Sequence, residues 1–295
     1  MGNKKIDLFI IGAQKAGTTS VFEYLKEHPD ISGHISQEFS FFIDDIEYSK
    51  GFSYSLKKYY NKKLNKKIIA KNAGLYVNEK AIKRLKEHNP YCKLVFILRN
   101  PVDRTISSYK MEYSSGWLNK RFNELPKEID LHNKGNYSLM YKLFIYQSLY
   151  SENLEIILKY FNINQIEIIF FEELKNNSLN ICKHLFSILD IDDSFIPNTT
   201  KTHNEFAHHK SRNIQKIFHT VSNEKNIIKQ FIKKILPYNI YIKIVSGIKN
   251  INKSDKKSNI DIEIDNTTID FLKQFYKPYN NKLKKMINSN LSYWD

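Results

Sequence analysis

The residues best suited to chemistry lie in two short segments, one near the start of the chain and one that begins at Arg99. The first reads Gly12-Ala13-Gln14-Lys15-Ala16-Gly17-Thr18-Thr19 and combines two glycines, a lysine and two hydroxyl side chains. Glycines let a loop turn tightly and aim its backbone N–H groups inward, and a helix that begins near Thr18 adds the positive end of its dipole. Together these groups predict a site for an anion of phosphate size.

The first segment differs from a Walker A loop, G-x-x-x-x-G-K-[ST], which needs a lysine directly after its second glycine. That position holds Thr18, and the lysine lies inside the loop as Lys15. The sequence also has no spacing of Asp, Glu and His typical of a magnesium or zinc site. Both observations disfavour an ATP-dependent kinase, which stays an alternative on the same architecture.

The first segment resembles the 5′-phosphosulfate loop of sulfotransferases, enzymes that use 3′-phosphoadenosine-5′-phosphosulfate (PAPS). The second is similar to the 3′-phosphate element of that family, in which an arginine and a serine eight positions later hold the ribose phosphate; here these are Arg99 and Ser107. The resemblance implies an enzyme that moves a sulfuryl group from PAPS to a hydroxyl or amine by direct in-line transfer, leaves adenosine 3′,5′-bisphosphate and requires no metal. A non-catalytic nucleotide-binding module is the alternative from a different class.

The resemblance also assigns roles to single residues. Lys15 would offset the negative charge that builds on the departing phosphate, as positioned cations do in phosphoryl transfer. Apart from the resemblance, Arg104 fits an anchor of the helix that follows the second segment better than a direct ligand. The residues expected to bind the donor are Gln14, Lys15, Ala16, Gly17, Thr18, Thr19, Arg99, Ser107 and, from a weakly similar late element, Arg212.

A candidate base lies in Gln37-Glu38-Phe39-Ser40-Phe41-Phe42. This segment resembles the branch that contains heparan sulfate and many bacterial sulfotransferases, where a Lys-Glu pair precedes Phe-Phe and the glutamate is the usual candidate base. Glu38 matches that glutamate, whereas Gln37 replaces the lysine. A carboxylate within hydrogen-bond reach of the acceptor can remove its proton. The alternatives are that Glu38 caps a turn or pairs with a lysine, and that His34 is the base.

Two further residues are expected on the acceptor side, Lys71 and Asn72. Related enzymes have a Glu-Lys pair before a tyrosine. If that tyrosine is aligned with Tyr76, Lys71 takes the position of the glutamate and Asn72 takes the position of the lysine. A slip of one residue would restore Lys71 as a pocket lysine, and the alternative is an exposed lysine at a strand end. Aromatic residues between Phe39 and Tyr59 fit a core better than a stacking surface for the acceptor. The acceptor itself, a small molecule, glycan or lipid, is not identified by the sequence.

Short apolar runs predict the elements that must position these residues. Four runs, at 8–11, 68–71, 94–98 and 166–171, read as strands separated by helical patterns. Such alternation predicts a three-layer α/β fold with a central parallel sheet, and both donor segments then follow carboxyl ends of strands. Helices are expected at 138–161 and 180–189. The resemblance implies the sulfotransferase fold, which is similar to P-loop nucleotide kinases, with a helical C-terminal part.

The 295 residues suit one sulfotransferase domain over 1–295, without repeats or glycine-serine linkers. Residues 197–265 turn polar and basic, which indicates a lid or an acceptor-side helical insertion. Within it, an apolar stripe from Ile227 to Ile235 suits a core-facing helix better than a membrane-surface helix.

The net charge of +15 favours an anionic partner, beginning with the nucleotide cosubstrate, and no motif indicates nucleic acid. The two cysteines, Cys92 and Cys182, are far apart, and no apolar run reaches the length of a membrane span. We therefore expect a cytoplasmic enzyme with contact to a membrane surface as the less favoured option. The oligomeric state is left open.

Overall fold

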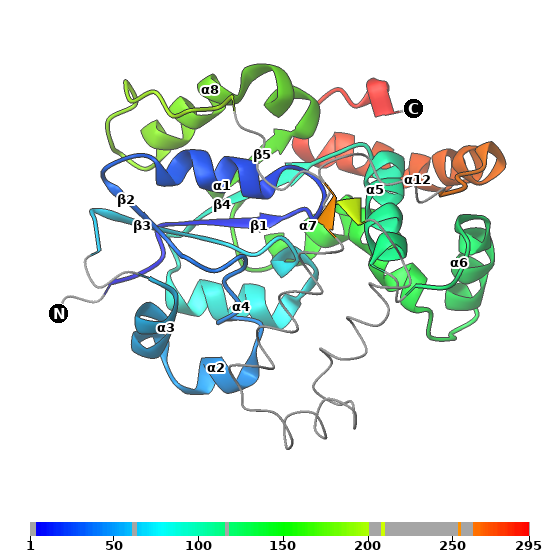
Figure 1. Cartoon of the computed structure of the whole chain (residues 1–295), viewed down its shortest axis with the longest axis horizontal. Coiled ribbons are helices and arrows are strands. Elements are labelled where there is room, and N and C mark those ends of the chain that lie inside the picture. The colour runs from blue at the N-terminus through cyan, green and yellow to red at the C-terminus, as the bar shows by residue number, and fades with distance from the viewer. Residues whose placement is uncertain are drawn as a thin grey trace. The chain divides into compact units, whose positions relative to one another are not determined.

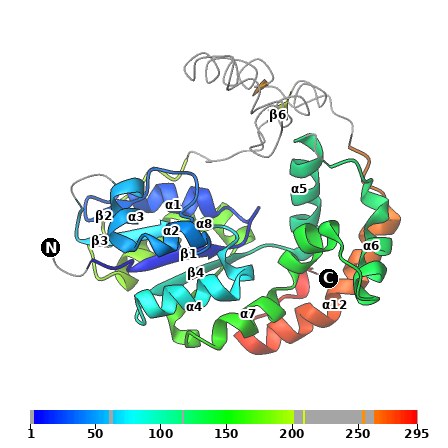
Figure 2. The same cartoon turned by 90° about the horizontal axis from the view of Figure 1, so that it is seen from below.

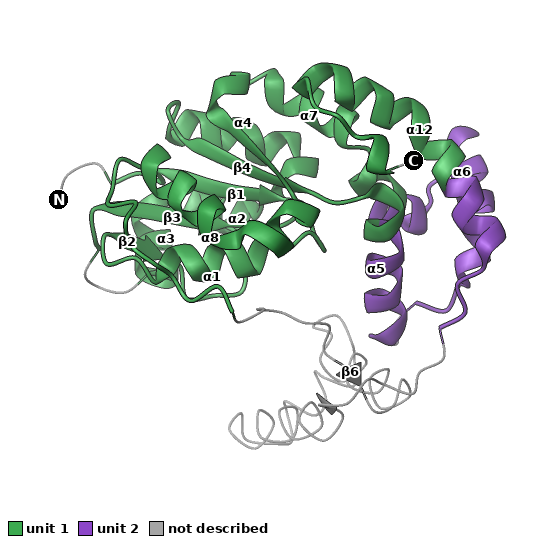
Figure 3. Cartoon of the chain, turned by 90° about the horizontal axis from the view of Figure 1, so that it is seen from above, with its two compact units in different colours: residues 1–104, 145–204, 273–295 green, residues 105–144, 205–272 purple. Residues whose placement is uncertain are grey.

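The structure is a computed structural model that describes residues 4–60, 64–115, 118–200 and 262–294, together with the backbone of two short antiparallel strands, β6 (His208–His209) and β7 (Lys253–Ser254) (Figure 1). The chain divides into two compact units. Unit 1 contains residues 1–104, 145–204 and 273–295, and unit 2 contains residues 105–144 and 205–272 (Figure 3). Most of the predicted lid at 197–265, with Arg212 and the apolar stripe at 227–235, lies outside the described residues.

Unit 1 is built on a five-stranded sheet in which every pair of neighbouring strands is parallel. The order across the sheet is β2-β3-β1-β4-β5. The strands are β1 (Leu8–Gly12), β2 (Ile31–Gly33), β3 (Lys67–Lys71), β4 (Lys93–Leu98) and β5 (Ile166–Phe170). The four predicted strands and the parallel sheet are confirmed, and β2 is an edge strand of three residues that is too short to give an apolar run.

Helices cover both faces of this sheet, as the prediction of three layers requires. The helices α1 (Thr18–Lys26) and α8 (Phe171–Ile188) lie on one face, and α4 (Glu79–His88) and α7 (Tyr150–Leu158) lie on the other (Figures 1 and 2). Because both faces are covered, the central strands are apolar throughout, and the first four residues of β1 have no exposed surface. Phe39, Phe41, Phe42 and Tyr59 are also buried in this core, so the core interpretation of the aromatic segment is confirmed for them.

The remaining helices complete the two units. The short helices α2 (Asp45–Ser49) and α3 (Phe52–Tyr59) follow β2, and α6 (Leu125–Asn133) belongs to unit 2. Two helices cross the boundary: α5 (Pro101–Ser114) begins in unit 1, and α12 (Asn266–Ile287), the expected helical C-terminal part, ends in it. Single turns lie at η1 (Leu75–Val77), η2 (Phe122–Glu124), η5 (Ile163–Gln165) and η6 (Ser292–Trp294). Within the described ranges, no helix is both long enough and apolar enough to span a bilayer.

The prediction of one helix over 138–161 is wrong. The segment contains a π-helical turn, η3 (Tyr141–Ile145), a 3-10 turn, η4 (Tyr146–Ser148), and only then α7. The side-chain amide of Asn153 donates to the carbonyls of Tyr146 and Leu149, and the Gln147 carbonyl accepts the Tyr76 hydroxyl. Side chains therefore satisfy carbonyls that a continuous helix would use itself, which periodicity alone does not reveal. The helix predicted at 180–189 is the second half of α8, which bends at Asn177.

Candidate active site

The loop between β1 and α1 requires glycine at both of its ends. A Cβ at Gly12 would lie 2.3 Å from Cδ1 of the buried Tyr76 ring, and one at Gly17 would lie 2.8 Å from Cδ2 of Leu174. Gly17 also has φ +86°, in the left-handed region that favours glycine. Between them, Lys15 adopts a positive φ of 72° as well. The chain therefore makes a tight reversal directly after a buried strand.

This reversal starts α1 in a way that suits an anion. The N-cap is Gly17, which has no side chain to cap the first turn, and Thr18, Thr19 and Ser20 bring no acidic group to it. The N–H groups and the positive end of the helix dipole are thus not neutralised by a capping carboxylate. Such an end is a ready-made site for phosphate or sulfate groups.

Arg99 joins the second predicted segment to the first. It follows β4, the neighbour of β1 in the sheet, and its Nη1 donates to the Lys15 carbonyl at 3.2 Å. The guanidinium lies over the Phe171 ring, 4.8 Å from its centre. Arg99 Nε is buried and has no hydrogen-bond partner among the described residues. The arginine is thus fixed beside the β1–α1 loop and keeps an unused donor.

Arg104 is the anchor that the sequence predicts. The side chain is fully buried, and its Nε donates to the Gln14 carbonyl at 3.2 Å. The same guanidinium donates to the side-chain oxygens of Gln14, Gln147 and Ser148. It thereby ties the β1–α1 loop to the start of α5 and to the irregular segment before α7. The Gln14 side chain takes part in this framework.

Two of the predicted donor residues, Ser107 and Arg212, stay untested. Ser107 is half-buried on α5 and belongs to unit 2, whereas Arg99 belongs to unit 1. Arg212 lies outside the described residues. The binding of the ribose phosphate by both of them stays a prediction.

Glu38 and Lys71 form a pair at the end of β3. Lys71 Nζ donates to Glu38 Oε1 at 2.7 Å and to Thr19 Oγ1 at 3.4 Å, and the lysine side chain is only 1% exposed. The backbone N–H of Ala73 donates to the other oxygen, Oε2, at 3.0 Å. Lys71 is therefore not the exposed strand-end lysine of the alternative. Glu38 does pair with a lysine, yet 34% of its side chain stays exposed.

His34 is a buried support for this pair, and its burial and contacts do not favour the alternative that it is the base. Its Nδ1 lies 2.8 Å from the Ser36 carbonyl, which can only accept, so Nδ1 carries the proton and Nε2 accepts the Lys71 N–H at 3.1 Å. The ring has no exposed surface and stacks on Phe22, with 4.3 Å between the ring centres. Burial lowers the pKa of His34 to about 3, which keeps the ring neutral at physiological pH. With both nitrogens in use, it has no free position for an acceptor proton.

Asn72 is also structural. Its side-chain amide donates to the Phe39 carbonyl at 3.3 Å, and its side-chain oxygen accepts the Gly74 N–H at 3.1 Å. The residue is buried and shapes the turn that presents the Ala73 N–H to Glu38. Its expected place in the acceptor cleft is not supported by these contacts.

Three cationic residues thus follow the carboxyl ends of neighbouring strands, and two of them have carboxylate partners: Lys71 pairs with Glu38, and Arg99 Nη2 lies 4.0 Å from Asp103 Oδ2. The strands β3, β1 and β4 are neighbours in that order. Lys71 is the last residue of β3, Lys15 lies in the loop after β1, and Arg99 directly follows β4.

Sequence reasoning missed Phe171, whose ring lies beneath Arg99, although its place directly after β5, the neighbour of β4, was a usable signal. In the part of the chain that the structure describes, no group of His, Cys, Asp and Glu could hold a metal ion. The arrangement can neutralise an anion and offer a carboxylate as a base.

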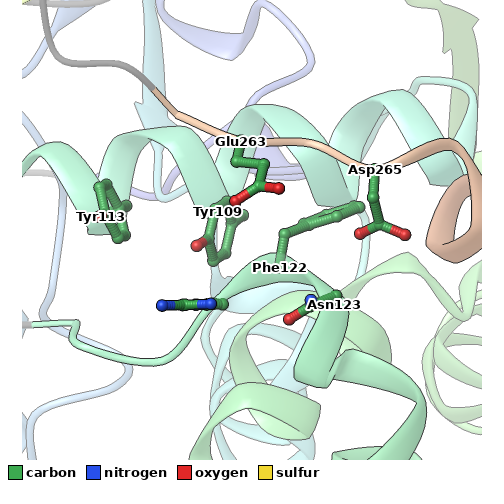
Figure 4. A pocket seen from close by; sticks show the side chains of 7 residues that line it. Tyr109, Tyr113, Phe122, Asn123, Glu263 and Asp265 are labelled. Carbon is green, nitrogen blue, oxygen red and sulfur yellow. The ribbon is translucent and has the colours of Figure 1, made fainter.

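Unit 2 has a separate cavity of about 270 Å³ (Figure 4). Its lining residues are Tyr109, Tyr113, Arg121, Phe122, Asn123, Glu263 and Asp265. Two of these side chains have structural bonds, because the Tyr109 hydroxyl donates to the Lys120 carbonyl and Asp265 accepts the Thr268 N–H. None of the lining residues is a site residue that the sequence predicts.

Comparison with known proteins gives a consistent result. A family model described as the sulfotransferase domain matches residues 5–237. Heparan sulfate glucosamine 3-O-sulfotransferase 5 of Mus musculus is 25% identical over 296 residues, which covers 96% of this chain and 72% of the relative. The bifunctional heparan sulfate N-deacetylase/N-sulfotransferase 1 of Caenorhabditis briggsae is 27% identical over 197 residues, covering 63% of this chain and 23% of the relative. The crystal structure of a sulfotransferase from Alicyclobacillus acidocaldarius covers 99% of both chains with a TM-score of 0.65 and 20% identity, and so confirms the predicted fold.

Proposed function

The chain belongs to the sulfotransferase domain family, and from that premise we propose that it transfers a sulfuryl group from PAPS to a hydroxyl or amine of an acceptor. Membership makes the protein a sulfotransferase enzyme.

The observation that carries the proposal is the hydrogen bond from Arg99 Nη1 to the Lys15 carbonyl. PAPS has two separated anionic groups, a 5′-phosphosulfate and a 3′-phosphate, so its protein must offer two anion sites close together. The start of α1 suits the first group, because Gly17 leaves its N–H groups without a capping side chain. Arg99 suits the second, because its buried Nε has no hydrogen-bond partner in the described ranges.

On the donor side, the residues would act by positioning and by charge. The sulfuryl group is anionic, and negative charge grows on the phosphate as the bond to it breaks. Lys15 would stabilise that charge, while the N–H groups of the first turn and the hydroxyls of Thr18 and Thr19 hold the 5′ end. Donors fixed before the reaction need no reorganisation during it, which makes them effective.

On the acceptor side, Glu38 would take the proton of the attacking hydroxyl or amine. The exposed third of its side chain leaves room for an acceptor to reach it. A carboxylate base needs a heavy-atom separation of about 2.6–3.2 Å from the proton donor in the bound complex. Two relatives act on heparan sulfate, as their names state, and a glucosamine-containing glycan is therefore the first acceptor to test.

We also propose that the enzyme works in a reducing compartment such as the cytoplasm. Cys92 and Cys182 are free and buried, and burial raises the pKa of both thiols. Buried thiols of this kind are chemically inert and do not need an oxidising environment.

A binding and transfer experiment tests the donor assignment. Adenosine 3′,5′-bisphosphate without magnesium should raise the melting temperature, and a ligand at 100 times its Kd adds about 2.7 kcal/mol of stability. Radiolabelled sulfate should then move from PAPS to at least one member of a panel of glucosamine glycans, phenols and lipids with hydroxyl groups. A response only to ATP with magnesium would identify a kinase. Binding of the bisphosphate without transfer to any acceptor would identify a module that lost its activity.

A further inference from the structure

We propose that Lys71 is a positioning residue that holds the Glu38 carboxylate and shields it from the anionic donor. This inference rests on the proposed function, and it assigns Lys71 to the catalytic arrangement rather than to acceptor binding.

The burial of Lys71 needs an explanation. Lysine is almost never fully buried without a partner, and removing a lysine–glutamate pair from water costs about as much as the pair returns in attraction. Lys71 is 1% exposed, and its ammonium bonds Glu38 Oε1 at 2.7 Å. Because such a pair adds little net stability, its presence at the edge of the site points to a role other than folding.

The position of the ammonium suggests that role. Lys71 Nζ contacts Glu38 on one side and Thr19 Oγ1, at 3.4 Å, on the other. Thr19 lies in the first turn of α1, where the proposed function places the phosphosulfate. A base and a sulfuryl anion on the two sides of this point would repel each other, and a cation between them offsets that repulsion.

Backbone hydrogen bonds also fix the positions of Glu38 and Lys71 relative to each other. The Phe39 N–H donates to the Lys71 carbonyl at 2.8 Å, and the Lys71 N–H donates to His34 Nε2 at 3.1 Å. The Ser36 hydroxyl donates to the Glu38 carbonyl at 2.8 Å. The segment that carries Glu38 is therefore attached to the strand end that carries Lys71. With Ala73 N–H on Oε2, the carboxylate has one orientation, as a base needs.

The test compares Lys71→Met and Lys71→Arg with Lys159→Met. Lys159 is a matched control because it also bonds a glutamate, Glu79, at 3.1 Å, but at an exposed position. We expect Lys71→Met to lower kcat about 10- to 100-fold, with the KM for PAPS and the Kd for adenosine 3′,5′-bisphosphate changed less than about threefold. Lys71→Arg should recover kcat to within about tenfold of the wild type, and Lys159→Met should be unchanged. Wild-type kcat in Lys71→Met, or a loss explained entirely by a smaller folded fraction, would overturn the inference.

A double variant keeps the test informative if Lys71→Met does not fold. Glu38→Gln with Lys71→Met removes both charges and leaves no unpaired buried charge, so it should fold better than Lys71→Met alone. Because Lys71 acts through Glu38, kcat of the double variant should equal that of Glu38→Gln within about twofold. A further tenfold loss in the double variant would overturn the inference. Failure of the proposed function is seen separately, because the wild-type enzyme itself would then show no transfer from PAPS.

Discussion

On the donor side of the site the binding groups come from consecutive residues between Gly12 and Thr19, and most are backbone N–H groups at the start of α1. On the base side they are the side chains of Glu38 and Lys71, which lie 33 positions apart and meet only when β3 is in place. A local backbone site depends on glycine and on a few cations. A non-local side-chain site depends on each partner of each pair. Substitutions should therefore distinguish the two sides by whether they change nucleotide binding or turnover.

The largest effect is expected at the centre of the donor side. Lys15→Ala removes the cation at the departing phosphate and should lower kcat about 10³-fold, since one preorganised donor contributes about 2.7–4 kcal/mol to the transition state. Nucleotide affinity should fall less than in Arg99→Ala. Initial rates with labelled PAPS and titration with adenosine 3′,5′-bisphosphate measure the two quantities. Lys50→Ala, on the exposed end of α2, is the control. Wild-type rates for Lys15→Ala and Arg99→Ala alike would refute the donor assignment.

The corresponding change on the base side is Glu38→Gln, which keeps the shape and removes the basicity. We expect kcat to fall about 10²-fold or more, in the range of general base catalysis, with the affinity for the bisphosphate within about threefold of wild type. Glu79→Gln is the control, because Glu79 also pairs with a lysine but at the surface. Retained turnover would remove Glu38 as the base and leave the site with a functional donor side only.

Arg99 should affect binding more than turnover. Arg99→Ala loses charge-assisted hydrogen bonds worth about 1.5–3 kcal/mol, so the Kd for adenosine 3′,5′-bisphosphate should rise about 10- to 100-fold. Lys175→Ala is a matched control, because its ammonium lies over the same Phe171 ring at 4.6 Å. Calorimetry or fluorescence titration gives the Kd of each variant for adenosine 3′,5′-bisphosphate. An equal loss in the two variants would mean that the positive charge near the ring matters, and not the arginine itself.

The same contrast explains what the sequence could and could not predict. The β1–α1 loop and Arg99 were found because their residues are consecutive or follow apolar runs, and parallel strands bring their carboxyl ends to one edge. The pairing of Lys71 with Glu38 was left open, because the two residues lie 33 positions apart and their contact depends on side-chain direction. His34 was offered as a base for the same reason: its type is visible in the sequence, but its burial and its two hydrogen bonds are not.

Helix continuity was the other point that patterns did not resolve. The apolar spacing over 138–161 is compatible with one helix, but the side chains of Asn153 and Tyr76 bond carbonyls of residues 146, 147 and 149, where the segment is not α-helical. The result is useful to the site, because Gln147 and Ser148 then reach Arg104, which holds Gln14. The Tyr76 bond spans 71 positions, so no short window of the sequence contains it, and the Asn153 bonds are local but leave no mark on the apolar periodicity.

The smallest free-energy change per step, and the one most specific to the base side, is the change in stability with each pH unit through His34. The pKa of His34 is lowered by burial to about 3 from an ordinary value of 6.5, so between these pH values the unfolded chain binds a proton that the folded chain does not. This contribution to stability is complete above pH 6.5. It should be lost at roughly 1.4 kcal/mol for each pH unit as the pH falls toward 3.

Denaturant unfolding between pH 4 and pH 7 measures this dependence. Burial also lowers the pKa of His88, to about 4, so the wild-type slope includes both histidines. His34→Gln should therefore make the slope shallower by about one proton, whereas His184→Gln, at an exposed position, should leave it unchanged. A wild-type slope in His34→Gln would mean that the ring titrates alike in the folded and unfolded chain. In that case His34 would not be the neutral link between Ser36 and Lys71, and the rigid orientation of Glu38 would need another source.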